Sequence, residues 1–173
     1  SYVKSVSYKD NFTTIENIAF IDIGFNKTSI VSYRNNHISF LQIIPIGGNH
    51  ITKDISKVLN IDLIDAEKIK LSFDKDENIL NKKKLSQNLV QKIIFARIEE
   101  ILEICTKNIK LNDDNEQFIH HKLILMGEGS KILDNKFKDK ISFSHKIDLL
   151  EETTRGIFES VTKLSKGLSK QEV

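Results

Sequence analysis

Three short segments of this 173-residue chain carry side chains and glycines that could bind a ligand. The first is Asp22–Ile23–Gly24, followed at a short distance by Thr28. An acid at the end of an apolar run, followed by a glycine turn, can place backbone amides and a hydroxyl around a phosphate while the carboxylate holds a metal ion through water. The structural alternative, in which Asp22 ends a strand and Gly24 makes a tight turn, has equal weight for so short a motif.

The second and third segments contain a charged pair and a glycine-rich turn. Glu67 and Lys70 lie three residues apart, so on a helix they share a face, where a carboxylate can bind ribose hydroxyls and a lysine stem can pack under a base. Taken alone, this pair is more simply a solvated surface ion pair. Gly127–Glu128–Gly129–Ser130 follows an apolar run, and its glycines would let a ligand approach the backbone closely. An ordinary strand-to-helix turn is the alternative interpretation there.

The elements that must position these segments can be predicted from periodicity. Apolar and β-branched runs predict strands at residues 18–22, 28–33, 38–44 and 122–126, the first three forming a β-meander. Helical spacing predicts a helix capped by Asn49, then a second one capped by Asp62 with Ala66 and Ile69 facing inward. Residues 85–109 predict a long helix, whose apolar stripe is Leu89, Ile93, Phe95, Ile98, Ile101, Leu102, Cys105 and Ile109.

The remaining segments are less regular. We expect a short strand near residues 2–6, a loop or small hairpin at 73–84, a weak strand at 141–143 and a final helix at about 149–168. This last helix has two interpretations, since its apolar face flanked by lysines could pack on the core or lie on an anionic membrane, and we favour the core.

Composition limits the possible functions. The chain is 39% hydrophobic and 29% charged, as expected for a globular domain, and its net charge of +2 predicts no nucleic-acid partner. Cys105, the only cysteine, sits in an apolar helical stretch and is expected to be a buried, inert thiol. The chain begins at Ser1 rather than Met, so we expect further sequence upstream.

The order of the three segments resembles the second half of an actin-like ATPase. Asp22–Ile23–Gly24 with Thr28 is similar to the second phosphate loop, Glu67 and Lys70 to the ribose contact, and residues 127–130 to the adenosine loop. Residues 44–55, leading to 65–70, resemble the bacterial cell-division family FtsA more specifically, as does the helical stretch 96–102. The likeness departs from the usual family pattern at Phe25, Asn26, Ser29 and Glu128.

This resemblance implies an α/β fold: the second lobe of the actin-like (ribonuclease H-like) ATPase fold, with a mixed β-sheet flanked by helices and a small helical and β subdomain. Residues 1–173 would form one lobe, in which 1–60 and 111–173 make the core subdomain and about 61–110 the smaller one. The nucleotide-binding residues implied are Asp22, Gly24, Thr28, Glu67, Lys70, Gly127, Gly129 and Ser130. Asp22 would hold Mg²⁺ through water.

The resemblance also implies a function. The chain would belong to a cytoplasmic protein that binds ATP with Mg²⁺ and self-assembles. This protein would bind the C-terminal peptide of FtsZ and so link FtsZ to the inner face of the membrane at the division site. The membrane helix would lie beyond this chain. ATP hydrolysis would be weak at most and would require the first lobe. The alternative is a nucleotide-free actin-like scaffold, in division or in pilus assembly as in the related PilM proteins.

Overall fold

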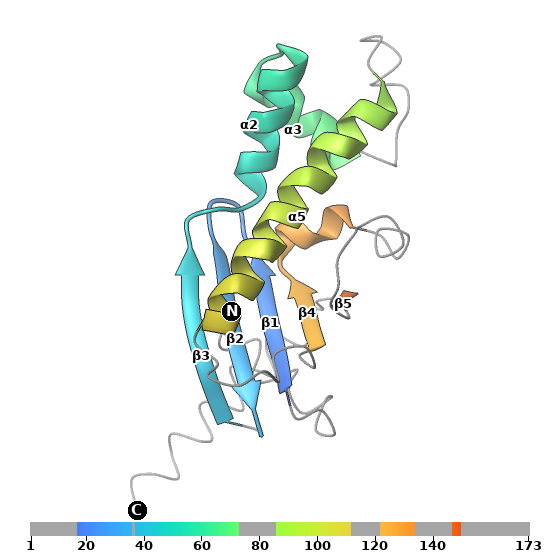
Figure 1. Cartoon of the computed structure of the whole chain (residues 1–173). Coiled ribbons are helices and arrows are strands. Elements are labelled where there is room, and N and C mark those ends of the chain that lie inside the picture. Colours follow the sequence, from blue (N-terminus) through green and yellow to red (C-terminus); the bar gives the residue numbers. More distant parts are fainter. Residues whose placement is uncertain (1–16, 36, 73–85, 112–121, 134–146, 150–173) are drawn as a thin grey trace, which may run out of the picture.

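The computed structural model describes residues 17–35, 37–72, 86–111, 122–133 and 147–149. Figure 1 shows one sheet, a long helix that crosses one of its faces, and two shorter helices beyond the end of its strands. The expectations for residues 2–6, 73–84 and 141–143 lie outside the described residues.

Five strands form a mixed sheet in the order β3-β2-β1-β4-β5. The predicted meander is confirmed: β1 (Asn17–Ile23), β2 (Thr28–Arg34) and β3 (His37–Ile44) pair antiparallel. β4 (Lys122–Met126) pairs parallel with β1, and β5 (Ile147–Leu149) pairs parallel with β4. Because β1 and β4 run in the same direction, their carboxyl ends meet at the same edge of the sheet.

Strand β5 corrects the predicted starting point of the final helix. Leu149 pairs with Leu125 as part of β5, so the final helix does not begin there. Where a short apolar run adjoins a longer helical pattern, periodicity alone cannot locate the boundary between strand and helix. Here the pairing with β4 shows that Leu149 belongs to a strand. The rest of that predicted helix lies outside the described residues.

Helix α2 (Gly48–Leu59) begins earlier than predicted. Its N-cap is Gly47, so the prediction that Asn49 caps it is wrong. A Cβ on Gly47 would lie 2.5 Å from the Gly24 carbonyl oxygen, and only a glycine lets the helix start this close to the β1–β2 turn. Helix α3 (Leu63–Ser72) begins as predicted, because Asp62 Oδ1 accepts a hydrogen bond from the Asp65 amide at 2.8 Å.

The long helix α5 (Gln87–Leu111) is confirmed, but its buried face is shifted in the first half. Val90 and Ile94 are fully buried there, whereas Leu89, predicted on the inner stripe, is 41% exposed. Neighbouring apolar residues offer two stripes at the same helical spacing, and only contact with the other elements selects one of them. Towards the C-terminus the predicted inner residues Ile98, Ile101, Leu102, Cys105 and Ile109 are buried.

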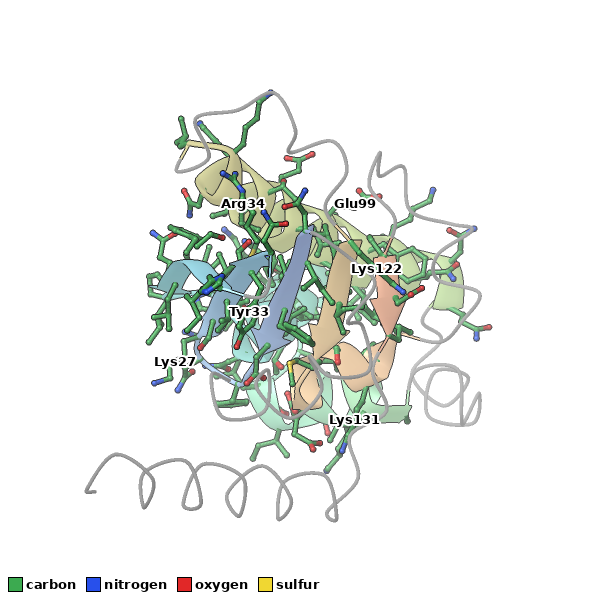
Figure 2. The ribbon with its side chains drawn as sticks, turned by 90° about the horizontal axis from the view of Figure 1, so that it is seen from below. Lys27, Tyr33, Arg34, Glu99, Lys122 and Lys131 are labelled. Atoms are coloured by element: carbon green, nitrogen blue, oxygen red, sulfur yellow. The ribbon has the colours of Figure 1, made fainter. Side chains whose placement is uncertain are left out.

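The core lies on both faces of the sheet. One face, with Ala19, Ile21 and Ile30, packs in one cluster with the buried residues of α2, α3 and α5. The opposite face carries a second cluster, in which Phe20 and Tyr33 meet edge to face at 6.0 Å. Figure 2 shows Arg34 on the α5 side of the sheet and its neighbour Tyr33 on the other side. A short 3₁₀ helix, η3 (Glu128–Ile132), follows β4 at the edge where β1 ends.

Candidate functional site

The three segments identified in the sequence meet beside one residue that sequence reasoning missed, Gly48. A methyl group on Gly48 would lie 3.7 Å from the Gly24 carbonyl oxygen, 3.7 Å from Gly129 Cα and 3.8 Å from Lys70 Nζ. The turn after β1, helix α3 and the turn after β4 therefore converge at the start of α2. We call Gly24, Gly48, Lys70 and Gly129 the glycine junction. The signal that could have found Gly48 is the Gly-Gly pair that directly precedes a helical pattern.

Asp22 and Gly127 form one side of this region. Asp22 is aligned with Met126 across the β1–β4 pair, which brings its carboxylate against Gly127. Gly127 has a φ of +92°, and a Cβ there would collide with Asp22 Oδ1 and would lie 2.6 Å from the Ile23 carbonyl oxygen. Position 127 thus requires glycine both for its backbone angle and for space.

Two predicted site residues, Thr28 and Ser130, use their hydroxyls within the protein. Thr28 Oγ1 donates to the Ile46 carbonyl at 2.7 Å, and Ser130 Oγ donates to the Gly127 carbonyl at 2.7 Å. Both side chains are buried. They hold the loop before α2 and the turn after β4 in place around the junction.

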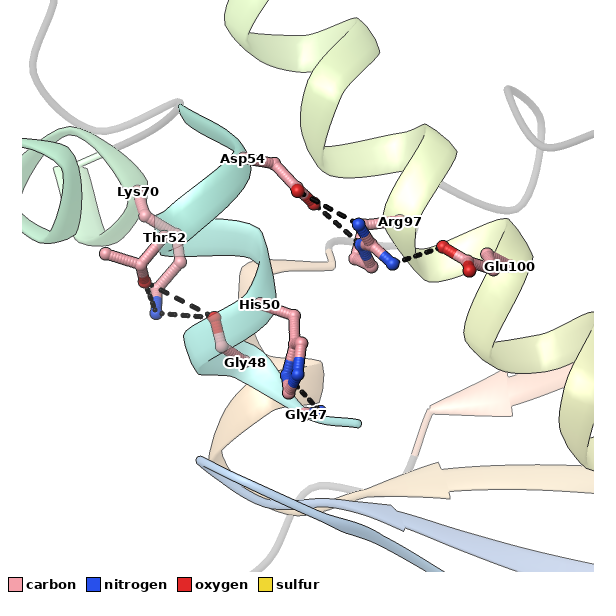
Figure 3. A network of polar contacts seen from close by, with 8 residues as sticks. All are labelled: Gly47, Gly48, His50, Thr52, Asp54, Lys70, Arg97 and Glu100. Carbon is pink, nitrogen blue, oxygen red and sulfur yellow. Dashed lines mark hydrogen bonds and ion pairs between the residues drawn. The ribbon is translucent and has the colours of Figure 1, made fainter. Parts of the chain in front are cut away.

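Lys70 is the charged centre of the junction. Only 4% exposed, it is not the solvated surface lysine that its spacing from Glu67 suggested in isolation. Its ammonium group donates to Glu67 Oε2 at 2.6 Å, to Thr52 Oγ1 at 2.8 Å and to the Gly48 carbonyl at 3.2 Å. Figure 3 shows the contacts to Thr52 and Gly48. A cation so deeply buried requires charge-assisted partners of this kind.

Thr52 is a second residue that the sequence analysis missed. It lies on the buried side of α2, next to Ile51, and its hydroxyl contacts both Glu67 and Lys70. A polar residue within an apolar helical face is a signal that could have identified it, because buried hydroxyls require partners.

The hairpin that joins β1 and β2 presents backbone amides next to the junction. Its carbonyls at Gly24 and Phe25 accept the first two amides of α2, from Gly48 at 2.9 Å and Asn49 at 2.7 Å. Within the described part of the chain, the amides of Phe25, Asn26 and Lys27 have no hydrogen-bond partner. Successive amides on a turn are a common binding element for anions such as phosphate.

The chemistry of these groups fits a nucleotide with its metal ion. The hairpin amides suit phosphate oxygens, and Glu67, whose side chain is 32% exposed and pairs with Lys70, can accept bonds from sugar hydroxyls. Among the residues the structure describes, no three His, Cys, Asp or Glu side chains are close enough together to hold a metal ion directly. Asp22 fits a Mg²⁺ ion bound mainly by phosphates and water.

A second polar feature lies between α2 and α5. Arg97 of α5 forms a two-pronged ion pair with Asp54 of α2, Nε to Oδ2 at 2.6 Å and Nη2 to Oδ1 at 2.9 Å, and also contacts Glu100 (Figure 3). The hydrogen bonds that Arg97 donates to Asp54 raise the pKa of its guanidinium above the ordinary value. These residues line what we call the α2–α5 pocket, of about 390 Å³, together with Val58, Lys92, Ile93 and Ala96.

None of the helices in the described ranges combines the length and the apolar character that crossing a membrane requires.

Comparisons with known proteins agree with this architecture. The chain is 34% identical over 108 residues to the cell division protein FtsA of Bacillus subtilis (strain 168), a match covering 54% of this chain and 24% of that protein. Thus the match spans about a quarter of the length of this curated relative.

Solved structures show the fold. MreB5 of Spiroplasma citri bound to ADP superposes with a TM-score of 0.71 at 18% identity, covering 98% of this chain and 59% of that one. A PilM–PilN type IV pilus biogenesis complex superposes with a TM-score of 0.58 at 17% identity, covering 92% and 42%. The expected actin-like lobe is therefore confirmed. The family described as "Cell division protein FtsA" matches residues 19–167, and the chain belongs to that family.

Proposed function

We propose that this chain is the second, nucleotide-binding lobe of a cytoplasmic division protein that binds ATP with Mg²⁺ at the glycine junction. The observation that carries the proposal is the convergence of Gly24, Gly129 and Lys70 around Gly48, where a side chain would fill the space between them. These residues come from three segments far apart in the sequence. The space beside Gly48 that carries no side chain is where a ligand would contact all three.

Each predicted residue has a proposed role at this site. Asp22 positions Mg²⁺ and its water, while Gly24 closes the hairpin through its bond to the Lys27 carbonyl and the hairpin amides that follow it contact phosphates. Thr28 orders the hairpin through the Ile46 carbonyl. Glu67 and Lys70 face the ribose, and the base side is formed by Gly127, Gly129 and Ser130. Hydrolysis requires groups from a first lobe, so this lobe alone is at most a weak ATPase.

Calorimetry on the intact protein tests nucleotide binding. We expect ATP with Mg²⁺ to bind with measurable heat and to raise the melting temperature. Asp22→Asn should weaken binding about tenfold in Mg²⁺ and have little effect in EDTA, because only the metal-dependent part of the affinity is lost. Asp62→Asn is the matched control, since asparagine caps a helix as well as aspartate. Absence of both heat and a melting shift in the wild type would refute this proposal.

For the partner, we propose that the C-terminal peptide of FtsZ binds at the α2–α5 pocket, most of whose lining residues belong to the predicted smaller subdomain of residues 61–110. The pocket combines a half-exposed apolar part, with Val58 at 55% exposure, and the cations Lys92 and Arg97, the latter already paired with Asp54 and Glu100. A peptide carboxylate would therefore bind Lys92, while apolar peptide side chains would pack on Val58, Ile93 and Ala96.

Co-sedimentation with FtsZ filaments tests the partner. Ala96→Glu adds bulk and negative charge to the pocket and leaves the Asp54–Arg97 pair intact, so we expect the variant to remain in the supernatant. Leu111→Glu makes a comparable change at the other end of α5, where the side chain is 70% exposed, and should co-sediment like the wild type. Equal pelleting of both variants would exclude this pocket as the docking site.

Membrane attachment and self-assembly complete the proposal. Membership of the FtsA family supports both, and in this proposal a helix outside this chain contacts the inner face of the membrane. Flotation of the intact protein with anionic vesicles tests attachment, and sedimentation with and without ATP tests assembly.

A second candidate function is a nucleotide-free scaffold, in division or in a PilM-like role in pilus assembly. The observation that favours it is the state of Lys70, whose ammonium already has three oxygen partners from the protein itself. The likeness to the PilM–PilN complex is compatible with such a role. Normal division or pilus assembly by an intact protein that binds no ATP would support this candidate.

A further inference from the structure

Phe25 is a large apolar side chain that lies outside the core. It sits at the tip of the β1–β2 hairpin, is 59% exposed, and belongs to neither hydrophobic cluster. Its ring lies over the Lys70 ammonium, which is 5.9 Å from the ring centroid. This is the geometry of a cation–π contact, and it links the hairpin to the charged centre of the glycine junction.

The hairpin backbone that carries the ring is held firmly. The Phe25 carbonyl accepts the Asn49 amide at 2.7 Å, and Asn26 Oδ1 accepts a bond from Asn49 Nδ2 at 3.0 Å. Lys70 is equally restrained by Glu67 and Thr52. With both ends of the contact restrained, rotation of the ring is the movement that breaks the contact between Phe25 and Lys70.

The Phe25 residue links the two halves of the proposed nucleotide site. Its backbone belongs to the hairpin, whose amides suit phosphates, and its ring contacts Lys70, which pairs with Glu67 on the sugar side. A ligand that contacts both halves would meet the ring where it lies against Lys70.

We propose that the Phe25 ring competes with nucleotide for the space next to Lys70 and must rotate away before nucleotide binds. The ring thereby limits the affinity of the site for nucleoside di- and triphosphates. This inference rests on the proposed nucleotide site and names the residue that controls access to it. Its physical basis is that bound nucleotide has to replace the ring–ammonium contact, which subtracts from the binding free energy.

Removal of the ring tests the proposal directly. In the intact protein, Phe25→Ala should bind ADP with Mg²⁺ roughly three- to thirtyfold more tightly than the wild type, measured by calorimetry. Alanine keeps the backbone restraint at this position, and the 59% exposure predicts little change in stability. Leu41→Ala, on edge strand β3 at 54% exposure, is the control and should leave ADP affinity unchanged.

A fluorescent variant reports the movement of the ring. The chain contains no tryptophan, so Phe25→Trp places a single indole from this chain at the hairpin tip. The wild-type protein differs only at position 25, so subtracting its emission removes the fluorescence of the rest of the intact protein. We expect saturating ADP with Mg²⁺ to change the indole emission as the ring leaves Lys70, and an unchanged emission at saturation would contradict the proposal.

The outcomes separate this inference from the proposed function. Equal or weaker ADP binding by Phe25→Ala, with a wild type that binds, overturns the role of Phe25 and leaves the nucleotide site standing. Binding by Phe25→Ala but not by the wild type supports the role of Phe25 and contradicts nucleotide binding by the natural protein. Binding by neither protein overturns both.

Discussion

The Lys70 ammonium is enclosed by oxygen atoms from two helices. Glu67 lies on the same helix, α3, whereas Thr52 and the Gly48 carbonyl belong to α2. Since a lysine buried to this extent is stable only when its charge is compensated, the network both joins α2 to α3 and presents a cation at the glycine junction.

Replacing Lys70 should therefore destabilise the fold. We expect Lys70→Met to lower the free energy of unfolding by about 2–4 kcal/mol, because it leaves Glu67 and Thr52 without their cation. Lys68→Met changes the same helix at a side chain that is 64% exposed, and should cost less than about 0.5 kcal/mol. Urea unfolding measures both, and equal losses would show that Lys70 contributes no more than a surface lysine.

Cys105 leads to a prediction about pH. Burial raises the pKa of its thiol from 9.0 to about 12, so the folded state keeps its proton where the unfolded state loses it. This contribution to stability is complete below about pH 9 and is lost as the pH rises towards 12, at up to about 1.4 kcal/mol per pH unit. Unfolding in urea between pH 8.5 and 10.5 should show a shallower decline for Cys105→Ala than for the wild type, and parallel pH profiles would contradict the prediction.

At the scale of elements, the start of α2 is joined to the β1–β2 hairpin by backbone hydrogen bonds and by the side-chain bond from Asn49 to Asn26. The amides of Gly48 and Asn49 donate to the hairpin carbonyls, and Gly47 lies close enough to exclude any side chain. The same helix holds Arg97 through Asp54 further along. Helix α2 therefore contacts both the glycine junction and the α2–α5 pocket.

Two neighbouring glycines should respond differently to the same substitution. A Cβ on Gly47 would lie 2.5 Å from the Gly24 carbonyl oxygen, so Gly47→Ala should cost about 2–3 kcal/mol of stability. A Cβ on Gly48 meets nothing closer than 3.7 Å, and alanine is a better helix former, so Gly48→Ala should stay within about 0.5 kcal/mol of the wild type. Chemical denaturation checks both, and a large loss for Gly48→Ala would contradict the geometry.

For the whole molecule, the sheet is buried unevenly. β1 is paired on both edges and its Phe20 and Ile21 are fully buried on opposite faces, whereas β3 lies at the edge of the described sheet with Leu41 and Ile43 more than half exposed. Resistance to local opening should follow this gradient.

Amide hydrogen exchange tests this gradient. We expect the amides of β1 and β4 to exchange most slowly, at rates set by global unfolding, and those of β3 to exchange at least about tenfold faster through local opening. Mass spectrometry of peptides from each strand provides the comparison. Equal protection of β1 and β3 would mean that the edge of the sheet is stabilised by contacts beyond those described.

Local patterns in the sequence determined the strands of the meander, β4, the cap at Asp62 and the existence of α5. They also identified the three segments that meet at the junction, because turns and caps depend on residues a few positions apart. The motif order was sufficient to indicate the actin-like lobe and the FtsA family, both of which are confirmed.

Only the tertiary structure decided which face of the first half of α5 is buried, that Lys70 is enclosed, and that Gly48 and Thr52 lie at the junction. Thr52 and Lys70 are separated by 18 positions in the chain, and no local period encodes their contact. Burial and charge compensation are properties of neighbours in space, so their free energies are set when α2, α3 and the sheet pack together. The sequence thus determined the individual strands, helices and turns, and packing determined which of their residues face one another.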